Sequence, residues 1–262
     1  MNYQKFLIAF CSICVSFVCI GQLQNDTSYS GLDSNFSILY LPKSNGNQLI
    51  HHAGYSLSYS EQAEQAEWVY YKLTSANFND GIKRSNDFRI DPYIFDGSAD
   101  LTDYTHSGYD RGHLAPAGSM KLSVQSMSQS FFMSNMSPQI PGFNRGVWKR
   151  LEEKVRYWTG SHDSIFVATG PILDNPIDTI GPNQVIVPRA YYKTLLAFGD
   201  NKIKGIAFLL PHEASDKSLY SFAVSIDSIE SITNIDFYYD LELSIQDEVE
   251  SNNSVKSFLF NR

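Results

Sequence analysis

The chain of 262 residues is 43% hydrophobic, contains three cysteines and has a formal net charge of −8. This length is enough for one domain with a large buried core. A uniformly acidic surface repels a polyanion, so an acidic chain that acts on nucleic acid must separate its charges into a basic face and an acidic face.

The first 21 residues are typical of a signal peptide. Lys5 precedes an apolar run over residues 6–18, which has the length of a signal-peptide core. This run is shorter than the about 20 apolar residues that a membrane span needs. It is also neither amphipathic nor rich in arginine, as a mitochondrial transit peptide would be. We therefore expect cleavage between Cys19 and Gln22, a secreted or periplasmic protein, and no membrane association after cleavage.

All three cysteines, Cys11, Cys14 and Cys19, lie in this segment. The mature chain then has no pair for an intramolecular disulfide, and its stability must come from the core. Residues 22–48 are rich in Ser, Asn, Asp and Gly, which predicts a flexible leader with a short strand at 38–41. We expect one folded domain over residues 49–262.

Strand patterns begin this domain. Residues 55–59 alternate at period two and residues 68–73 are aromatic and β-branched, so both predict strands. The adjacent His51 and His52 would point to opposite faces of a strand and cannot easily chelate one ion, so we interpret them as structural or exposed. Residues 92–107 predict a polar loop.

A helical segment is predicted at residues 119–132 and a turn at 138–142. From Asn144 a helix is predicted to run to about Trp158 and to end at Gly160. Its apolar residues have the spacing of one buried helix face; they are Val147, Leu151, Val155 and Trp158.

The rest of the chain favours strands, at 164–169, 184–187, 191–198 and 203–210, with a hairpin turn at 199–201. Residues 219–226 predict either a strand or the lead into a helix at 226–233. The pattern favours one α+β domain with a central, mostly antiparallel sheet.

Residues 109–152 concentrate groups that can act together. His113 can accept a proton near neutral pH, and Arg111 is a permanently charged fork that fits phosphate. Asn135, Asn144 and Glu152 offer oxygens that a hard divalent cation prefers. Taken singly, a histidine is more often structural and an asparagine near a helix start usually caps it. Together these groups suit hydrolysis of a phosphodiester.

Three motifs in this order, Asp110-Arg-Gly-His113, Ser134-Asn-Met-Ser-Pro-Gln139 and Asn144-x7-Glu152, resemble the DNA/RNA non-specific endonucleases. That family includes secreted bacterial sugar-non-specific nucleases and mitochondrial endonuclease G. The resemblance covers roughly Tyr55 to the C-terminus. It also takes in Glu67–Val69, Ala168–Pro171, Val187–Pro188 with Lys193, and Asp236–Phe237.

The resemblance implies a ββα-metal active site and metal-dependent cleavage of DNA and/or RNA without sequence specificity. His113 is then the general base on a strand. Arg111, two residues earlier, shares its face and contacts the phosphate. Asn135 supports the site by hydrogen bonding.

The following helix supplies the metal site for Mg²⁺ or Mn²⁺. Asn144 and Glu152 are eight residues apart, which on a continuous helix is about 12 Å along the axis. One ion cannot bind both directly at about 2.1 Å. We therefore expect Asn144 as the direct ligand and Glu152 to act through water on the ion.

The family also places a phosphate-binding arginine at the head of an Arg-x3-Phe-x2-Asp pattern, which Arg84, Phe88 and Asp91 match. Arg84 is therefore preferred over Arg89 as the phosphate contact, and Arg145 is a further candidate. The plainer interpretation is that these are solvated surface charges. Residues 213–250 hold ten acidic residues and only Lys217 as a base, so a basic face with an acidic back reconciles the net charge with the substrate.

Two other functions remain open. One is a catalytically inactive nuclease-like module that binds nucleic acid or a protein, although the presence of both His113 and Asn144 argues against it. The other is a metal-dependent phosphodiesterase of small nucleotides. Among partners besides DNA and RNA, a homodimer and an inhibitor protein are left open.

Overall fold

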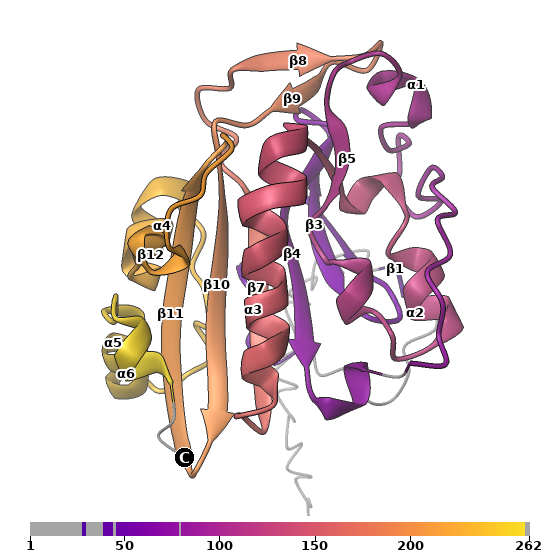
Figure 1. Cartoon of the computed structure of the whole chain (residues 1–262). Coiled ribbons are helices and arrows are strands. Elements are labelled where there is room, and N and C mark those ends of the chain that lie inside the picture. The colour runs from indigo at the N-terminus through magenta and orange to yellow at the C-terminus, as the bar shows by residue number, and fades with distance from the viewer. Residues whose placement is uncertain (1–27, 30–38, 44–45, 79, 260–262) are drawn as a thin grey trace, which may run out of the picture.

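An eight-stranded sheet organises the structure, a computed structural model that describes residues 28–29, 39–43, 46–78 and 80–259. Its strand order is β1-β2-β3-β4-β7-β10-β11-β12, and within it only β1 and β2 run parallel. The predicted α+β fold with a mostly antiparallel sheet is thereby confirmed (Figure 1). The strands are β1 (Ser28–Tyr29), β2 (Gln48–His51), β3 (Ser56–Ser60), β4 (Gln65–Leu73), β7 (Ser164–Pro171), β10 (Ala190–Gly199), β11 (Lys202–Pro211) and β12 (Ala223–Val224).

Helices cover both faces of this sheet. On β4, Val69 and Tyr71 belong to the core cluster that contains the apolar residues of α3 (Lys149–Thr159). Trp68 and Tyr70 belong to a second cluster with α4 (Ile226–Thr233) and α5 (Leu243–Glu250). This alternation is what a strand buried on both faces requires. The predicted buried face is confirmed, since Leu151, Val155 and Trp158 of α3 and Val147 just before it are all buried.

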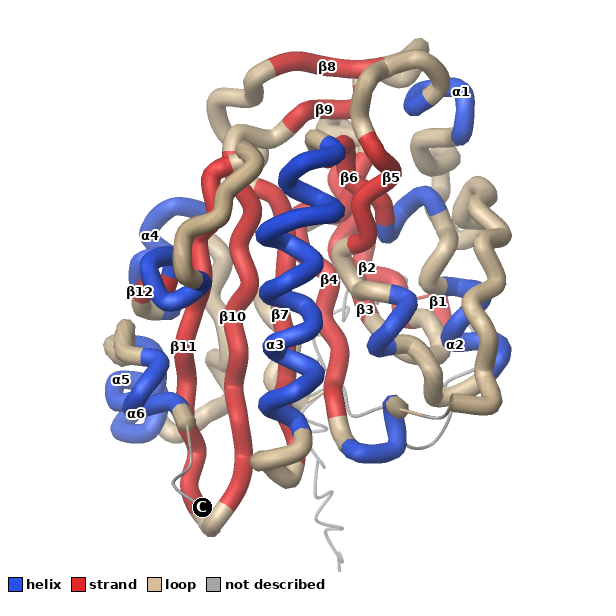
Figure 2. Tube along the Cα trace, viewed as in Figure 1, coloured by secondary structure: helices blue, strands red, loops and turns tan. Residues whose placement is uncertain are grey.

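A smaller unit lies beside the N-terminal half of α3 (Figure 2). Here β5 (Asp110–His113) pairs antiparallel with β6 (Met136–Gln139), and the chain then passes through a π-helical turn, η4 (Phe143–Trp148), into α3. The turn predicted at 138–142 is wrong in part, because Pro138 lies within β6. Proline is tolerated there since β6 has β5 as its only neighbour in a two-stranded sheet. The other two-stranded sheet is β8 (Asp178–Ile180) with β9 (Val185–Val187).

The helix predicted at 119–132 is much shorter than expected. Only α2 (Val124–Gln129) forms, between single turns of 3₁₀ helix. Serine side chains explain the shortening: Ser123 accepts from the Ser126 amide, and the Ser130 hydroxyl donates to the Met127 carbonyl. The remaining short helices are η1 (Ser75–Asn77), α1 (Leu101–Tyr104), η2 (Ala117–Ser119), η3 (Met133–Asn135), η5 (Leu219–Phe222) and α6 (Val255–Phe258).

One loop prediction and one strand prediction also needed correction. The loop predicted at 92–107 contains α1, which Asp100 caps by accepting from the Thr102 amide. At the strand predicted for 38–41, Leu39 and Tyr40 form a turn, with Tyr40 at φ +64°.

The strands predicted after residue 160 are confirmed. Asp200 and Asn201 both adopt positive φ (49° and 56°), as a tight hairpin between β10 and β11 requires. At 219–226 the helical alternative is the correct one, since only Ala223–Val224 is strand before α4.

The predicted signal peptide, most of the predicted leader and the three cysteines lie outside the described residues, and the domain boundaries stay predictions. In the described part of the chain, no helix combines the length and apolar character needed to cross a membrane.

Candidate active site

A cleft of about 550 Å³ opens between β5, the start of α3 and the segment around η2. The structure brings six of the eight candidate site residues into its lining, and places Arg89 and Asn135 outside it. The full lining is Arg84, Arg111, His113, Pro116, Ala117, Gly118, Asn144, Arg145, Lys149, Glu152 and Arg156.

His113 ends β5 with its ring held between two phenylalanines. The ring centroid lies 4.9 Å from that of Phe131 and 5.8 Å from that of Phe88, both edge to face. Trp148 Nε1 donates to the His113 carbonyl at 3.4 Å, which ties this strand to η4. The residue is 9% exposed, and its buried Nε2 has no hydrogen-bond partner.

This environment keeps the imidazole neutral. Burial lowers the pKa of His113 to about 3, and the charges of Arg84 and Arg111 contribute to the same shift. A general base must be unprotonated before it acts. His113 is therefore unprotonated throughout the neutral and mildly acidic range, which is the form that a general base requires.

The same two phenylalanines support the cleft arginines. The Arg111 guanidinium lies 4.3 Å from the Phe88 ring centroid, and that of Arg84 lies 4.7 Å from the Phe131 centroid. Arg111 and His113 share one face of β5, as their spacing predicts. Two cations and a neutral base are thereby held on one aromatic platform.

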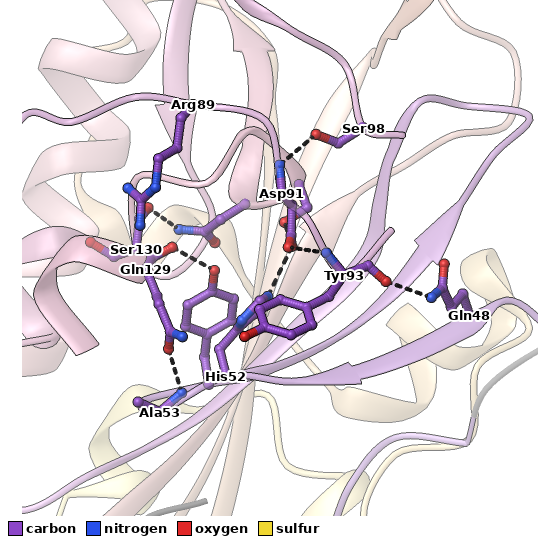
Figure 3. A network of polar contacts seen from close by, with 12 residues as sticks. Gln48, His52, Ala53, Arg89, Asp91, Tyr93, Ser98, Gln129 and Ser130 are labelled. Atoms are coloured by element: carbon purple, nitrogen blue, oxygen red, sulfur yellow. Dashed lines mark hydrogen bonds and ion pairs between the residues drawn. The ribbon is translucent and has the colours of Figure 1, made fainter. Parts of the chain in front are cut away.

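Asp91, the last member of the Arg-x3-Phe-x2-Asp pattern, is a buried anchor (Figure 3). Its Oδ2 contacts His52 Nε2 at 2.9 Å and accepts from the Ser134 hydroxyl at 2.5 Å, and its Oδ1 accepts from the Tyr93 amide at 3.0 Å. These bonds fix the segment that carries Arg84 and Phe88. His52 is thus structural, and His51 is likewise buried.

Arg89 is occupied elsewhere. Its Nη1 donates to Asp87 Oδ2 and to the Ser128 carbonyl, and its guanidinium lies 4.2 Å from the Phe132 ring centroid. Of the two arginines in the pattern, Arg84 is the one that lines the cleft.

The Asp110 carboxylate organises the start of the helix. It accepts from Asn144 Nδ2 at 2.9 Å and from Arg145 Nε and Nη2 at 2.8 and 2.5 Å. Although burial opposes the shift, these bonds hold the pKa of Asp110 below its usual value. Because the Asn144 NH₂ group is committed to Asp110, its Oδ1 is the amide atom left for a hard cation. Arg145 lines the cleft while paired to Asp110.

The prediction that one continuous helix carries Asn144 and Glu152, from which a separation of about 12 Å was expected, is wrong. Gly146, at φ −104° and ψ −109°, is not helical and lies inside η4, so no continuous α-helix connects Asn144 to Glu152. A π-type turn of this kind recurs at functional sites. Both residues nevertheless line the same cleft.

Beneath Glu152 lies a residue to which the sequence reasoning assigned no role, Lys193. It is fully buried on β10, donates to Thr169 Oγ1 at 3.0 Å and lies 4.6 Å from the Trp148 ring centroid. Burial raises the pKa of Glu152, whereas the charges of Lys193 and Arg156 oppose that rise. Burial in turn lowers the pKa of Lys193. The lysine thus favours the charged form of the cleft carboxylate.

Lys149 and Arg156 also line the cleft without having been singled out. They lie three residues before and four residues after Glu152, so all three share one helix face, a spacing readable from the sequence. A Cβ on Gly118 would approach Arg156 Cζ to 3.3 Å, so the glycine allows the guanidinium to lie close to the chain. The lining therefore holds one carboxylate, Glu152, and five cations: Arg84, Arg111, Arg145, Lys149 and Arg156.

Asn135 is fully buried and acts through the backbone. Its Oδ1 accepts from the Ala115 amide at 2.9 Å, and its Nδ2 donates to the Ala115 and Ser130 carbonyls. It therefore fixes the chain just after His113 and is a positioning residue.

The burial of neutral His113 predicts a pH-dependent loss of stability. An unfolded histidine takes up a proton below about pH 6.5, whereas the folded one does so only near pH 3, so stability falls as the pH drops from 6.5 toward 3. Between pH 7 and pH 5 the wild type should lose about 2 kcal/mol more than His113→Gln. Urea unfolding in a chelator measures this difference; equal losses in the two proteins would contradict it.

Comparison with known proteins is consistent with this geometry. The family model described as DNA/RNA non-specific endonuclease matches residues 33–243. Nuclease C1 of Cunninghamella echinulata var. echinulata is 35% identical over 210 residues, covering 72% of this chain and 82% of that protein. Human mitochondrial endonuclease G is 33% identical over 205 residues, covering 72% and 69%.

A solved structure of the EndoG/EndoGI complex, described as revealing the mechanism of EndoG inhibition, superimposes with a TM-score of 0.73. The identity is 31%, and the match covers 80% of this chain and 94% of that chain.

Proposed function

The chain belongs to the DNA/RNA non-specific endonuclease family, and from that premise we propose that His113 is its general base and Asn144 its metal ligand. The observation that carries the proposal is the cleft itself, where a neutral, buried histidine lies beside two arginines and an oriented amide oxygen. The reaction is endonucleolytic hydrolysis of a phosphodiester.

His113 takes a proton from a water molecule that attacks the phosphorus in line with the leaving 3′-oxygen. Arg111 and Arg84 contact the non-bridging oxygens, where negative charge accumulates in the transition state. Their aromatic supports hold both guanidinium groups in place before the substrate arrives, so little reorganisation accompanies the reaction.

The donor set fits a hard divalent cation, Mg²⁺ or Mn²⁺. Asn144 offers one oxygen, and Glu152 supplies the only negative charge in the cleft lining. When bound, such an ion neutralises the phosphate and the leaving oxygen. The five cationic side chains in the same lining would repel a divalent metal ion that binds alone. We therefore expect tight metal binding only together with the substrate phosphate.

Glu152 orients water next to Asn144 by accepting hydrogen bonds. Its burial would favour the neutral acid, which accepts poorly, and Lys193 and Arg156 counter that tendency. We propose Lys193 as a positioning residue for this carboxylate.

Cleavage without sequence preference follows from the same lining. Cationic side chains meet phosphates, which carry no direct sequence information. An inhibitor protein is a further proposed partner, supported by the solved EndoG/EndoGI complex, and the basic cleft would favour an inhibitor with an acidic surface. A homodimer stays a further proposal.

The first test is nicking of a supercoiled plasmid with and without a chelator. Chelation should abolish nicking, and His113→Ala should slow it by about 10²–10⁴-fold, because the general base is lost. His106→Asn changes an exposed histidine outside the cleft and should leave the rate unchanged. An inactive wild type would favour the binding module, and activity confined to small nucleotides would favour the phosphodiesterase.

The second test separates the two metal-site residues. Asn144→Ala should raise the Mg²⁺ concentration needed for half-maximal activity, since the direct ligand is lost. Glu152→Gln should lower the rate about 10–100-fold with a smaller change in that concentration. Titration of activity against Mg²⁺ measures both effects. Normal metal dependence in Asn144→Ala with none left in Glu152→Gln would reverse the assignment.

We also propose that the protein is secreted or periplasmic, on the strength of the apolar run at residues 6–18. Mass spectrometry of the exported product should then find an N-terminus near Gln22, and reductants should leave activity unchanged because the cysteines are removed. A mature soluble product that retains Met1 would overturn this proposal, and recovery in mitochondria would point to the compartment named for several relatives.

A further inference from the structure

Three carboxylates gather where α4 and α5 pack against β11, away from the cleft. One oxygen each from Asp227, Glu230 and Glu250 lies within 4.8 Å of the others. Asp227 and Glu230 are three residues apart on α4 and therefore share a helix face, and Glu250 ends α5. Figure 1 shows both helices beside β11.

The backbone prevents these groups from moving apart easily. A Cβ on Gly205 of β11 would lie 2.4 Å from the Val249 carbonyl oxygen and 3.0 Å from Ile226 Cδ1. Both helices are therefore packed closely on the strand immediately next to the two ends of the cluster. In addition, Glu230 Oε1 accepts from the Phe237 amide at 2.7 Å, which fixes this side chain.

Glu250 points to a ligand. The residue is only 5% exposed, and its Oε1 is buried without a hydrogen-bond partner. A buried acceptor with no partner is costly and uncommon in folded proteins. A cation between the three carboxylates would give this oxygen a partner.

The local charge points the same way. Among the ion pairs of the described residues, none involves Asp227, Glu230 or Glu250. Burial raises the pKa of Glu250 to about 8. Repulsion from Glu230, Asp227 and Asp236 adds to the shift, and a hydrogen bond with the Gln246 side chain opposes it. Either a cation or a shared proton must relieve this repulsion near neutral pH.

We propose that Asp227, Glu230 and Glu250 form a second divalent-cation site, with Ca²⁺ as the preferred ion, that fastens α4 to α5. Three carboxylates from two helices can supply up to six oxygens in an irregular arrangement, which Ca²⁺ accepts. Mg²⁺ demands near-octahedral geometry and gives up its water reluctantly. The site is structural and independent of catalysis at the cleft.

The test uses Asn144→Ala as background, so that ion binding at the cleft does not contribute. Its melting temperature should rise by roughly 5–10 °C when Ca²⁺ at about 100 times its Kd replaces a chelator. Mg²⁺ should give a smaller rise. Equilibrium dialysis with radioactive calcium should find one bound ion per chain.

Glu250→Gln on that background should lose both the bound ion and the temperature rise, and should melt no lower than its parent in chelator because like-charge repulsion is removed. Glu248→Gln, an exposed neighbour on α5, should retain both. Glu250→Gln on the native chain should nick plasmid at the wild-type rate.

Two results would overturn the site. One is a full calcium response in Glu250→Gln. The other is a parent protein that ignores calcium and loses stability as the pH rises from about 4.5 to about 8. That is the behaviour of a shared proton that the folded protein keeps up to about pH 8 and the unfolded chain loses near pH 4.5.

Discussion

The hydrogen bonds that Asp110 accepts from Asn144 and Arg145 join the two halves of the ββα unit. Asp110 begins the strand that ends in His113, so its carboxylate sets the position of the helix start relative to the base. Bonds to an ionised acceptor are among the stronger ones in proteins. Asn144 lines the cleft, and because Asp110 accepts from its NH₂ group, the Oδ1 atom is left free of that contact. Asp110 therefore positions Asn144 relative to the strand that carries His113.

Charge separation resolves the conflict between a net charge of −8 and a polyanionic substrate. Five cations line the cleft, while part of the acidic surplus gathers on α4 and α5. The cleft arginines have two consequences at once: they attract phosphate, and they help to keep His113 unprotonated. A protonated histidine would add a sixth cation but could no longer accept a proton, so attraction of the substrate is left to the arginines while the ring stays in the form that a general base requires.

Much of this could be predicted from the sequence, because strand periodicity and motif order are local properties. Arg111 and His113 share a face since a strand repeats every two residues, and the buried stripe of α3 follows from the helical repeat. The cleft lining contains Arg84 and not Arg89, in agreement with the preference for Arg84. The physical reason lies in contacts that the sequence pattern does not show. Arg89 donates hydrogen bonds to Asp87 and Ser128. Ser128 lies on α2, so this contact depends on where α2 packs in the fold.

What could not be predicted depends on tertiary packing. In the sequence, Gly146 is compatible with a helix interior, but in the structure it has a non-helical conformation. On either side of it, Asn144 donates to Asp110 and Trp148 donates to the His113 carbonyl. Lys193 shows the same limit. A lysine on a strand is ordinarily exposed, but this mostly apolar strand is buried on both faces. The ammonium group of Lys193 lies 4.6 Å from the Trp148 ring centroid, near Glu152. Burying a lysine ammonium group costs desolvation free energy, which a nearby opposite charge can offset. The half-buried Glu152 carboxylate at the cleft is that charge, so charged and polar groups continue from the cleft into the core of the sheet.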